Sequence, residues 1–176
     1  ASLIKTLLIS ADLRYADLNA VDLSNANLNS ALLNGATLIS ASLGSATLLR
    51  SALCGANLTH ANLANANLME ADLSDAELTG ADLRRSVLIN AVLNRVNLSH
   101  ANLSHANLNR AVLTSSDMQG ASLYGANLAD ANLHFVDFTD VDLGGVTVEK
   151  ARFKRNLGLS KEKEAELKRQ GAIFEA

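Results

Sequence analysis

An apolar residue stands at every fifth position of the chain from Leu3 to Phe153, thirty-one times without interruption. Twenty-seven of these central residues are leucine, and the four exceptions are Met118, Phe138, Val148 and Phe153. The residue two positions before each centre is Ala in twenty-two units and otherwise Ser, Thr or Val, and the residue between them is often Asp or Asn. The repeating unit is therefore Ala-(Asp/Asn)-Leu followed by two variable residues, as in Ala61-Asn62-Leu63.

Apolar spacings that alternate between two and three residues fit neither the 3.6-residue period of a helix nor the two-residue period of a continuous strand. The spacing instead predicts a short straight side followed by a corner in every unit. Gly at the fifth place, as in Gly35 and Gly80, favours type II turns, because Gly accepts the positive φ that these turns need. Other units carry residues such as Ser or Arg at that place and predict type I turns. A chain that keeps turning one way and stacks its coils is a β-solenoid.

These units resemble the pentapeptide-repeat family over residues 1–155. The resemblance implies an all-β solenoid, a right-handed quadrilateral β-helix with four units per coil and about 7.75 coils. It also implies a rod roughly 37 Å long at an inter-strand spacing of ~4.8 Å, and it points to a cyanobacterial source.

Leu and Ala must form nearly all of the interior, because aromatic residues make up only 3% of the chain and Trp is absent. The absence of Pro agrees with strands that are paired on both sides and use every backbone N–H. The structural core is predicted to include Leu18, Leu63, Leu83, Leu103, Met118, Phe138 and Phe153.

The five-residue register ends after Arg155, so the chain divides into a rod at 1–155 and a C-terminal cap at 156–176. Ser160 is a helix N-cap residue, Gly171 stops the helix, and the pattern predicts a helix over about 161–169. The residues expected to cover the last coil are Leu157, Leu159, Ala165, Leu167, Ile173 and Phe174. At the other end, Ile4, Leu7 and Ile9 fall at outward sites, consistent with a fraying first coil, with cover by a missing segment, or with an end-to-end or side-to-side dimer contact.

The polar residues give no pattern typical of an enzyme. Asp and Asn alternate freely before the centres, at positions that include Asp12, Asp72, Asp82, Asp137 and Asp142. An amide cannot replace a catalytic acid, so these residues are interpreted as turn-bonding groups. The four His residues lack the convergent spacing of metal ligands, and Cys54 is expected to be a solvent-facing free thiol. The sequence therefore predicts no enzyme, no metal and no cofactor.

Charge is distributed in bands along a chain of net charge -3. Some pentapeptide-repeat proteins resemble B-form DNA and act on gyrase, so the resemblance implies a DNA mimic as an alternative function. A rod of this length would need roughly 22 net negative charges to match the duplex. One band is basic and is a candidate contact for nucleic acid or for an acidic protein, although without interleaved aromatic residues it is a weak nucleic-acid signal. It comprises Arg84, Arg85, Arg95, His100, His105 and Arg110.

An outward-facing set of aliphatic side chains is the second candidate surface. At a spacing of 20 residues, Leu49, Met69 and Ile89 would stack in successive coils. Val87, Val92 and Val112 would lie beside them and complete a candidate interface. Exposed apolar patches often mark contacts, although isolated surface aliphatic residues are also tolerated on solenoids.

The sequence thus predicts a non-enzymatic rod that binds a protein partner or a second copy of itself, with DNA-mimic binding of a type II topoisomerase (gyrase) as the alternative. No run of about 18 apolar residues is present, so no membrane insertion is expected. The expected compartment is the cytoplasm; a leader removed before Ala1 would place the protein in the thylakoid lumen or the periplasm.

Overall fold

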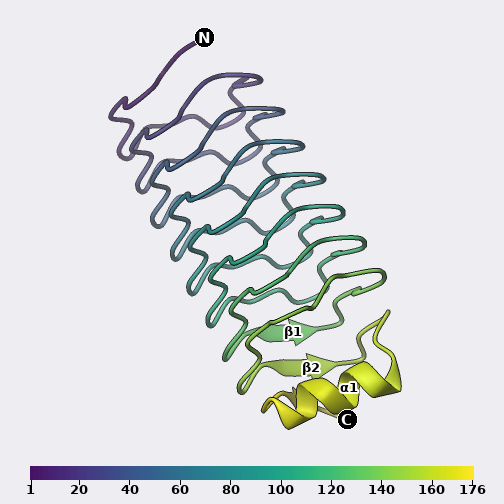
Figure 1. Cartoon of the computed structure of the whole chain (residues 1–176). Coiled ribbons are helices and arrows are strands. Elements are labelled where there is room, and N and C mark those ends of the chain that lie inside the picture. The colour runs from purple at the N-terminus through teal and green to yellow at the C-terminus, as the bar shows by residue number, and fades with distance from the viewer.

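A computed structural model describes all residues, 1–176, and shows the chain winding in stacked coils with the two termini at opposite ends (Figure 1). Parallel backbone pairing joins residues that are 20 positions apart, such as Asp22 with Ser42 and Ser42 with Asn62. The hydrogen bonds follow the same register, as in Leu23 N to Ser42 O at 2.7 Å. Since each unit has five residues, four units complete one coil.

On most sides of the coils only the middle residue forms a β-bridge, so these sides do not count as strands. Three short strands occur near the C-terminus: β1 (Asn132–His134), β2 (Arg152–Lys154) and β3 (Ile173–Phe174). They form one parallel sheet in the order β1-β2-β3. The one helix, α1 (Lys161–Arg169), lies across the end of the rod after β2 (Figure 1).

All thirty-one corners have the same backbone conformation, with positive φ at the fifth residue of the unit. The prediction of type I turns at Ser and Arg corners is therefore wrong: φ is 56° at Arg50 and 60° at Ser115. The reason is that the ladder between coils continues through the corner, where Arg50 N donates to Met69 O at 3.0 Å. A corner of another type would break this ladder, so stacking imposes the left-handed conformation on residues that ordinarily avoid it.

The interior is a single cluster of 53 buried apolar residues that runs along the rod. Leu63, Leu83, Leu103 and Met118 are fully buried, and the rings of Phe138 and Phe153 meet with centroids 5.8 Å apart. Two of the three buried serines satisfy their hydroxyl groups locally: Ser51 and Ser86 each donate to the preceding central leucine carbonyl at 2.7 Å. Leu18, in the first coil, is 8% exposed.

The C-terminal segment packs on the last coil through fewer side chains than the sequence predicts. Leu167 is buried, and Leu159 and Phe174 are partly buried against the core. Leu157, Ala165 and Ile173 are exposed, in contrast to the prediction. Leu157 and Ile173 occupy middle positions of the ladder, opposite Asp137 and Arg152, and such positions point outward.

The helix begins and ends at the predicted residues. Ser160 Oγ accepts a hydrogen bond from Lys163 N at 3.2 Å, which is an N-cap contact. Beyond the helix, the Phe174 ring stacks on Phe153 at 4.7 Å and 10°. At the opposite end the first coil is paired on one side only, and Ile4, Leu7 and Ile9 are 48%, 76% and 56% exposed.

Candidate binding surfaces

The Asp and Asn residues at the middle of each side bond to the backbone of the following turn. Asp22 Oδ1 accepts from Ser24 N at 2.9 Å, and Asn57 Oδ1 accepts from Thr59 N at 3.0 Å. Both residue types make this bond because both offer Oδ1 as an acceptor. The free alternation of acid and amide therefore follows from a turn-bonding role.

The apolar stripe, defined as Leu49, Met69, Ile89, Val87, Val92 and Val112, lies along one corner of the rod and the two adjoining sides. The carbonyl groups of Met69 and Ile89 accept from the corner residues of the preceding coil, which places the three corner side chains in adjacent coils. Val92 pairs with Val112 on the next side. All six residues are partly buried.

The six basic residues of the predicted band do not form one surface. Arg84 Nε and Nη2 bind the Asp82 carboxylate at 2.9 and 2.6 Å, and Arg95 Nε and Nη2 bind Asp75 at 2.7 Å each. These hydrogen bonds hold the pKa of both carboxyl groups below the usual value and largely neutralise the two guanidinium groups. Arg110 lies on another corner, so only part of the band remains as a cationic site.

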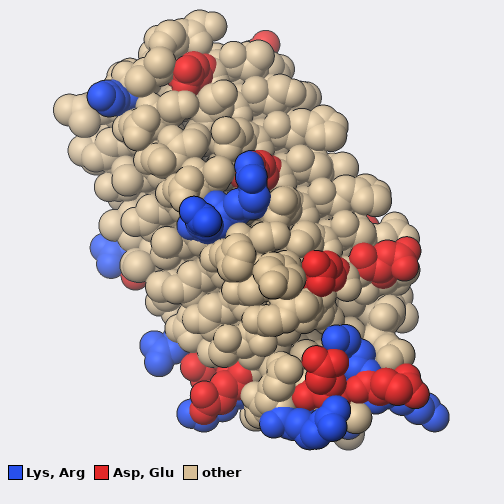
Figure 2. Space-filling model, viewed as in Figure 1, with Lys and Arg blue, Asp and Glu red and all other residues tan.

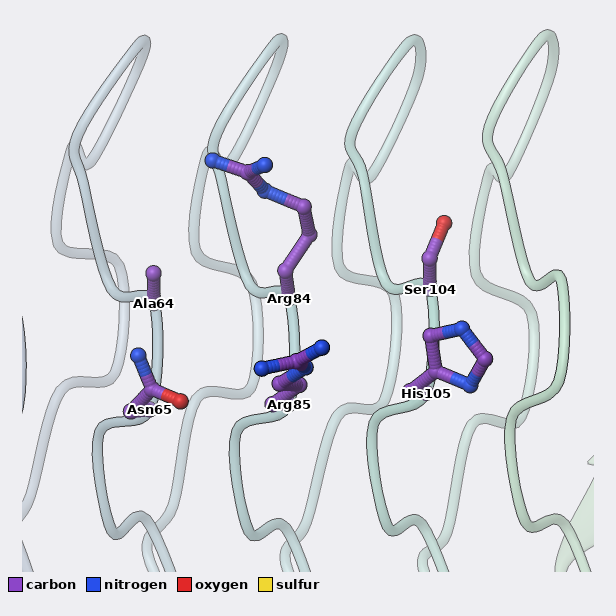
Figure 3. A pocket seen from close by; sticks show the side chains of 6 residues that line it. All are labelled: Ala64, Asn65, Arg84, Arg85, Ser104 and His105. Carbon is purple, nitrogen blue, oxygen red and sulfur yellow. The ribbon is translucent and has the colours of Figure 1, made fainter.

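Arg85 and His105 are the two members that the structure brings together without an acidic partner. They lie at the same corner in successive coils, with Asn65 in the coil before them (Figure 3). Ala64, Arg84 and Ser104 form a second row beside them and complete the lining of a pocket of about 420 Å³. Reasoning from the sequence missed this pocket, although the spacing of 20 residues between Arg85 and His105 was a readable signal.

Aromatic and imidazole rings at the corners lie over glycines of the next coil. A β-carbon built on Gly80 would lie 2.5 Å from Nδ1 of His60, and one built on Gly125 would lie 2.6 Å from Nδ1 of His105. Gly120 has the same relation to His100. These three histidines are thus placed by packing, and the structure brings no group of three metal-binding side chains together.

Cys54 is half-buried rather than fully solvent-facing as the sequence predicts. Burial, together with the hydrogen-bonded carboxylate of Asp72 in the next coil, raises the pKa of the Cys54 thiol to about 11. A thiol with a raised pKa is mostly protonated at neutral pH and is a weak nucleophile.

The family model described as "Pentapeptide repeats" matches eight copies in the chain, between residues 1 and 155. A pentapeptide-repeat protein, Rfr23, from the cyanobacterium Cyanothece 51142 is 36% identical over 52% of this chain, with a TM-score of 0.51. The match covers 63% of that relative's own length. No curated protein matches the chain in sequence.

QnrB1, a plasmid-mediated fluoroquinolone resistance protein, is similar over a longer stretch. The match covers 93% of this chain and 85% of QnrB1, with a TM-score of 0.64. Its identity of 18% shows a shared fold alone. A pentapeptide-repeat protein from the Arabidopsis thaliana thylakoid lumen is 21% identical over 69% of this chain and 77% of that chain, with a TM-score of 0.43. The structure contains no helix with the length and apolar character needed to cross a membrane.

Proposed function

Because the chain belongs to the pentapeptide-repeat family, we propose that it is a non-enzymatic interaction module that binds a protein partner through the apolar stripe. The central side chains are consumed by the buried core, so recognition falls to the outward positions. The proposed rod is right-handed with about 7.75 coils, spans 1–155, and is closed by a cap at 156–176. We place it in the cytoplasm, with the thylakoid lumen or periplasm as the alternative.

The observation that supports this proposal is the continuity of the stripe over three coils at one corner. At ~4.8 Å between coils, Leu49, Met69 and Ile89 form a ridge of aliphatic side chains that is flanked by valines on both sides. The Arg50–Glu70 ion pair, at 2.7 Å, gives the ridge a polar edge. An apolar centre with a polar rim is the usual anatomy of a protein interface.

The test is the double substitution Met69→Glu with Ile89→Glu. Ile39→Glu is the matched control, since Ile39 also stands at a fourth place and is 37% exposed but lies at another corner. The double variant should keep the melting curve of the parent and lose a cross-linked partner that the control retains. If sedimentation shows a dimer that the double variant dissolves, the partner is a second copy; if all three proteins are monomers with identical cross-linked partners, the proposal fails.

The alternative is a DNA mimic that binds a type II topoisomerase, and it draws on the likeness to QnrB1. The charge distribution argues against it, because the net charge is -3 where a mimic would need roughly 22 negative charges. On the face shown in Figure 2, charged side chains are sparse along the coils and gather near the C-terminal end, where acidic and basic groups are mixed. A gyrase supercoiling assay separates the two proposals: inhibition at micromolar protein would support the mimic.

A further inference from the structure

The pocket at Asn65, Arg85 and His105 lies on a corner that the apolar stripe does not occupy, and we propose that it binds a phosphate group. The ligand class is an oxyanion, either free phosphate or a phosphomonoester. This site does not depend on the interface proposed above, because none of the six residues that line the pocket belongs to the apolar stripe, although Val87 lies on the side between the two corners.

Arg85 supplies the charge for this site. Its guanidinium has no ion-pair partner in the structure, whereas Asp82, the nearest acid in sequence, is bound by Arg84. A free guanidinium presents parallel N–H donors whose spacing matches two oxygens of a phosphate. Because Arg84 satisfies the neighbouring carboxylate, Arg85 remains available to an external anion.

The surroundings of Arg85 lack competing acids. The middle positions beside the pocket, which carry Asp in many other units, are Asn in the coils before and after: Asn62, Asn67, Asn102 and Asn107. In the coil that contains Arg85, the two middle positions are Asp82, whose charge is paired with Arg84, and the uncharged Val87. The local field is therefore positive within a chain whose net charge is -3.

His105 is the second donor in this proposal, and its ring is placed by two contacts. Its ring lies over Gly125 and meets the edge of Tyr124 at 5.6 Å and 89°. Figure 3 shows Asn65, Arg85 and His105 in a row at one corner, with the Arg84 side chain directed away from the row. The amide of Asn65 makes no side-chain hydrogen bond in the structure, whereas Ser104 already bonds Asn102 at 2.6 Å and only lines the wall.

The composition of the wall selects the ligand. Guanidinium, imidazole and amide groups can all donate hydrogen bonds to an anion, and the single apolar lining residue is Ala64. This wall offers no apolar slot for a nucleobase or a lipid chain, so recognition rests on the charged group itself. The volume of about 420 Å³ lies within the range of small-ligand sites.

The experiment is a titration of the full chain with sodium phosphate at constant ionic strength, followed through the imidazole signals of the four histidines by NMR. We expect one histidine, His105, to shift saturably, while His60, His100 and His134 do not. Arg85→Gln should weaken binding about tenfold or more, and Arg85→Lys should retain part of it. The control Arg110→Gln removes another corner arginine without an ion pair and should bind as the parent does.

A second pair of variants separates the His105 contribution from a general charge effect. Gly125→Ala displaces the His105 ring and should weaken binding, whereas Gly120→Ala displaces only His100 and should not. Parallel titrations with inorganic phosphate and with a phosphoserine peptide identify the source of the group, since binding of either one supports the site. The proposal is overturned if neither produces a saturable shift, if all four histidines shift together, or if Arg85→Gln binds phosphate as well as the parent.

Discussion

The imidazole ring of His100 lies over Gly120, the residue at the same corner one coil further along the rod. A β-carbon on residue 120 would lie 2.6 Å from Nδ1 of the ring, a distance that real side chains do not tolerate. Twenty-five corner residues other than Gly also adopt positive φ, so the turn alone does not require glycine here. The ring in its present position leaves no room for a β-carbon on residue 120, and the same relation joins Tyr15 with Gly35 and His60 with Gly80.

Gly120→Ala should therefore destabilise the rod more than Gly55→Ala. Both substitutions carry the left-handed backbone penalty of about 1 kcal/mol, but a β-carbon on residue 55 meets nothing within 4 Å. Displacing the His100 ring should add about 1 kcal/mol or more, measured by chemical denaturation. The combination His100→Ala with Gly120→Ala should remove this extra loss of unfolding free energy. Equal losses for Gly120→Ala and Gly55→Ala would contradict the contact.

Leu63→Ala should lower the free energy of unfolding by about 2 to 5 kcal/mol, because it leaves a cavity in a fully buried position. Asn62→Ala, on the adjacent outward position, removes one turn bond to Ala64 N and should cost about 1 kcal/mol. Leu83→Asp should be worse than either, since it buries a carboxylate without a partner. Denaturation curves of the three variants give the order, and a Leu63→Ala curve as mild as that of Asn62→Ala would argue against an inward leucine.

Phe174→Ala should release the C-terminal segment. The ring stacks on Phe153 at 4.7 Å, and Lys168 Nζ lies 4.9 Å from its centre. Its loss should cost about 2 kcal/mol and make α1 sensitive to trypsin at Lys168 and Arg169. Ile173→Ala is the control on the same strand, because Ile173 is 47% exposed; similar trypsin sensitivity in both variants would show that the stacking does not hold the segment.

Cys54 should react slowly with iodoacetamide. A pKa raised from the usual 9.0 to about 11 lowers the thiolate fraction at pH 8 by roughly a hundredfold. The rate should rise with pH up to about 11 and should approach that of a free thiol after unfolding. Asp72→Asn removes the adjacent charge, keeps a turn acceptor for Ser74 N, and should accelerate the reaction; a native rate equal to the unfolded rate would refute the protection.

The five-residue period was enough to predict the solenoid, because the chain must turn once in every unit to bring each successive central residue to the interior. Propensity misled the turn prediction at Arg50 and Ser115, since the ladder between coils overrides the preference of a single residue for negative φ. The same cause explains Leu157, whose apolar character suggested burial while the ladder register turned it outward.

The basic band was predicted from charged residues that are close in sequence, whereas the residues that meet in the structure are 20 positions apart. Arg84 and Arg85 are adjacent and equivalent in the sequence. In the structure Arg84 forms an ion pair with Asp82, whereas Arg85 has no acidic partner. His105 joins Arg85 only through the stacking of coils. Whether a charged side chain is free or paired depends on side-chain direction, which no linear count of charges contains.

The stacking of residues 20 apart is tested most directly by distances between spin labels along one corner. With Cys54 replaced by Ser, label pairs at residues 30 and 110, 30 and 130, and 30 and 150 lie four, five and six coils apart. The backbone separations should be ~19, ~24 and ~29 Å, a rise of ~4.8 Å for every 20 residues. Pulsed electron–electron double resonance that gives this linear series supports the account, and distances that do not increase in equal steps would contradict it.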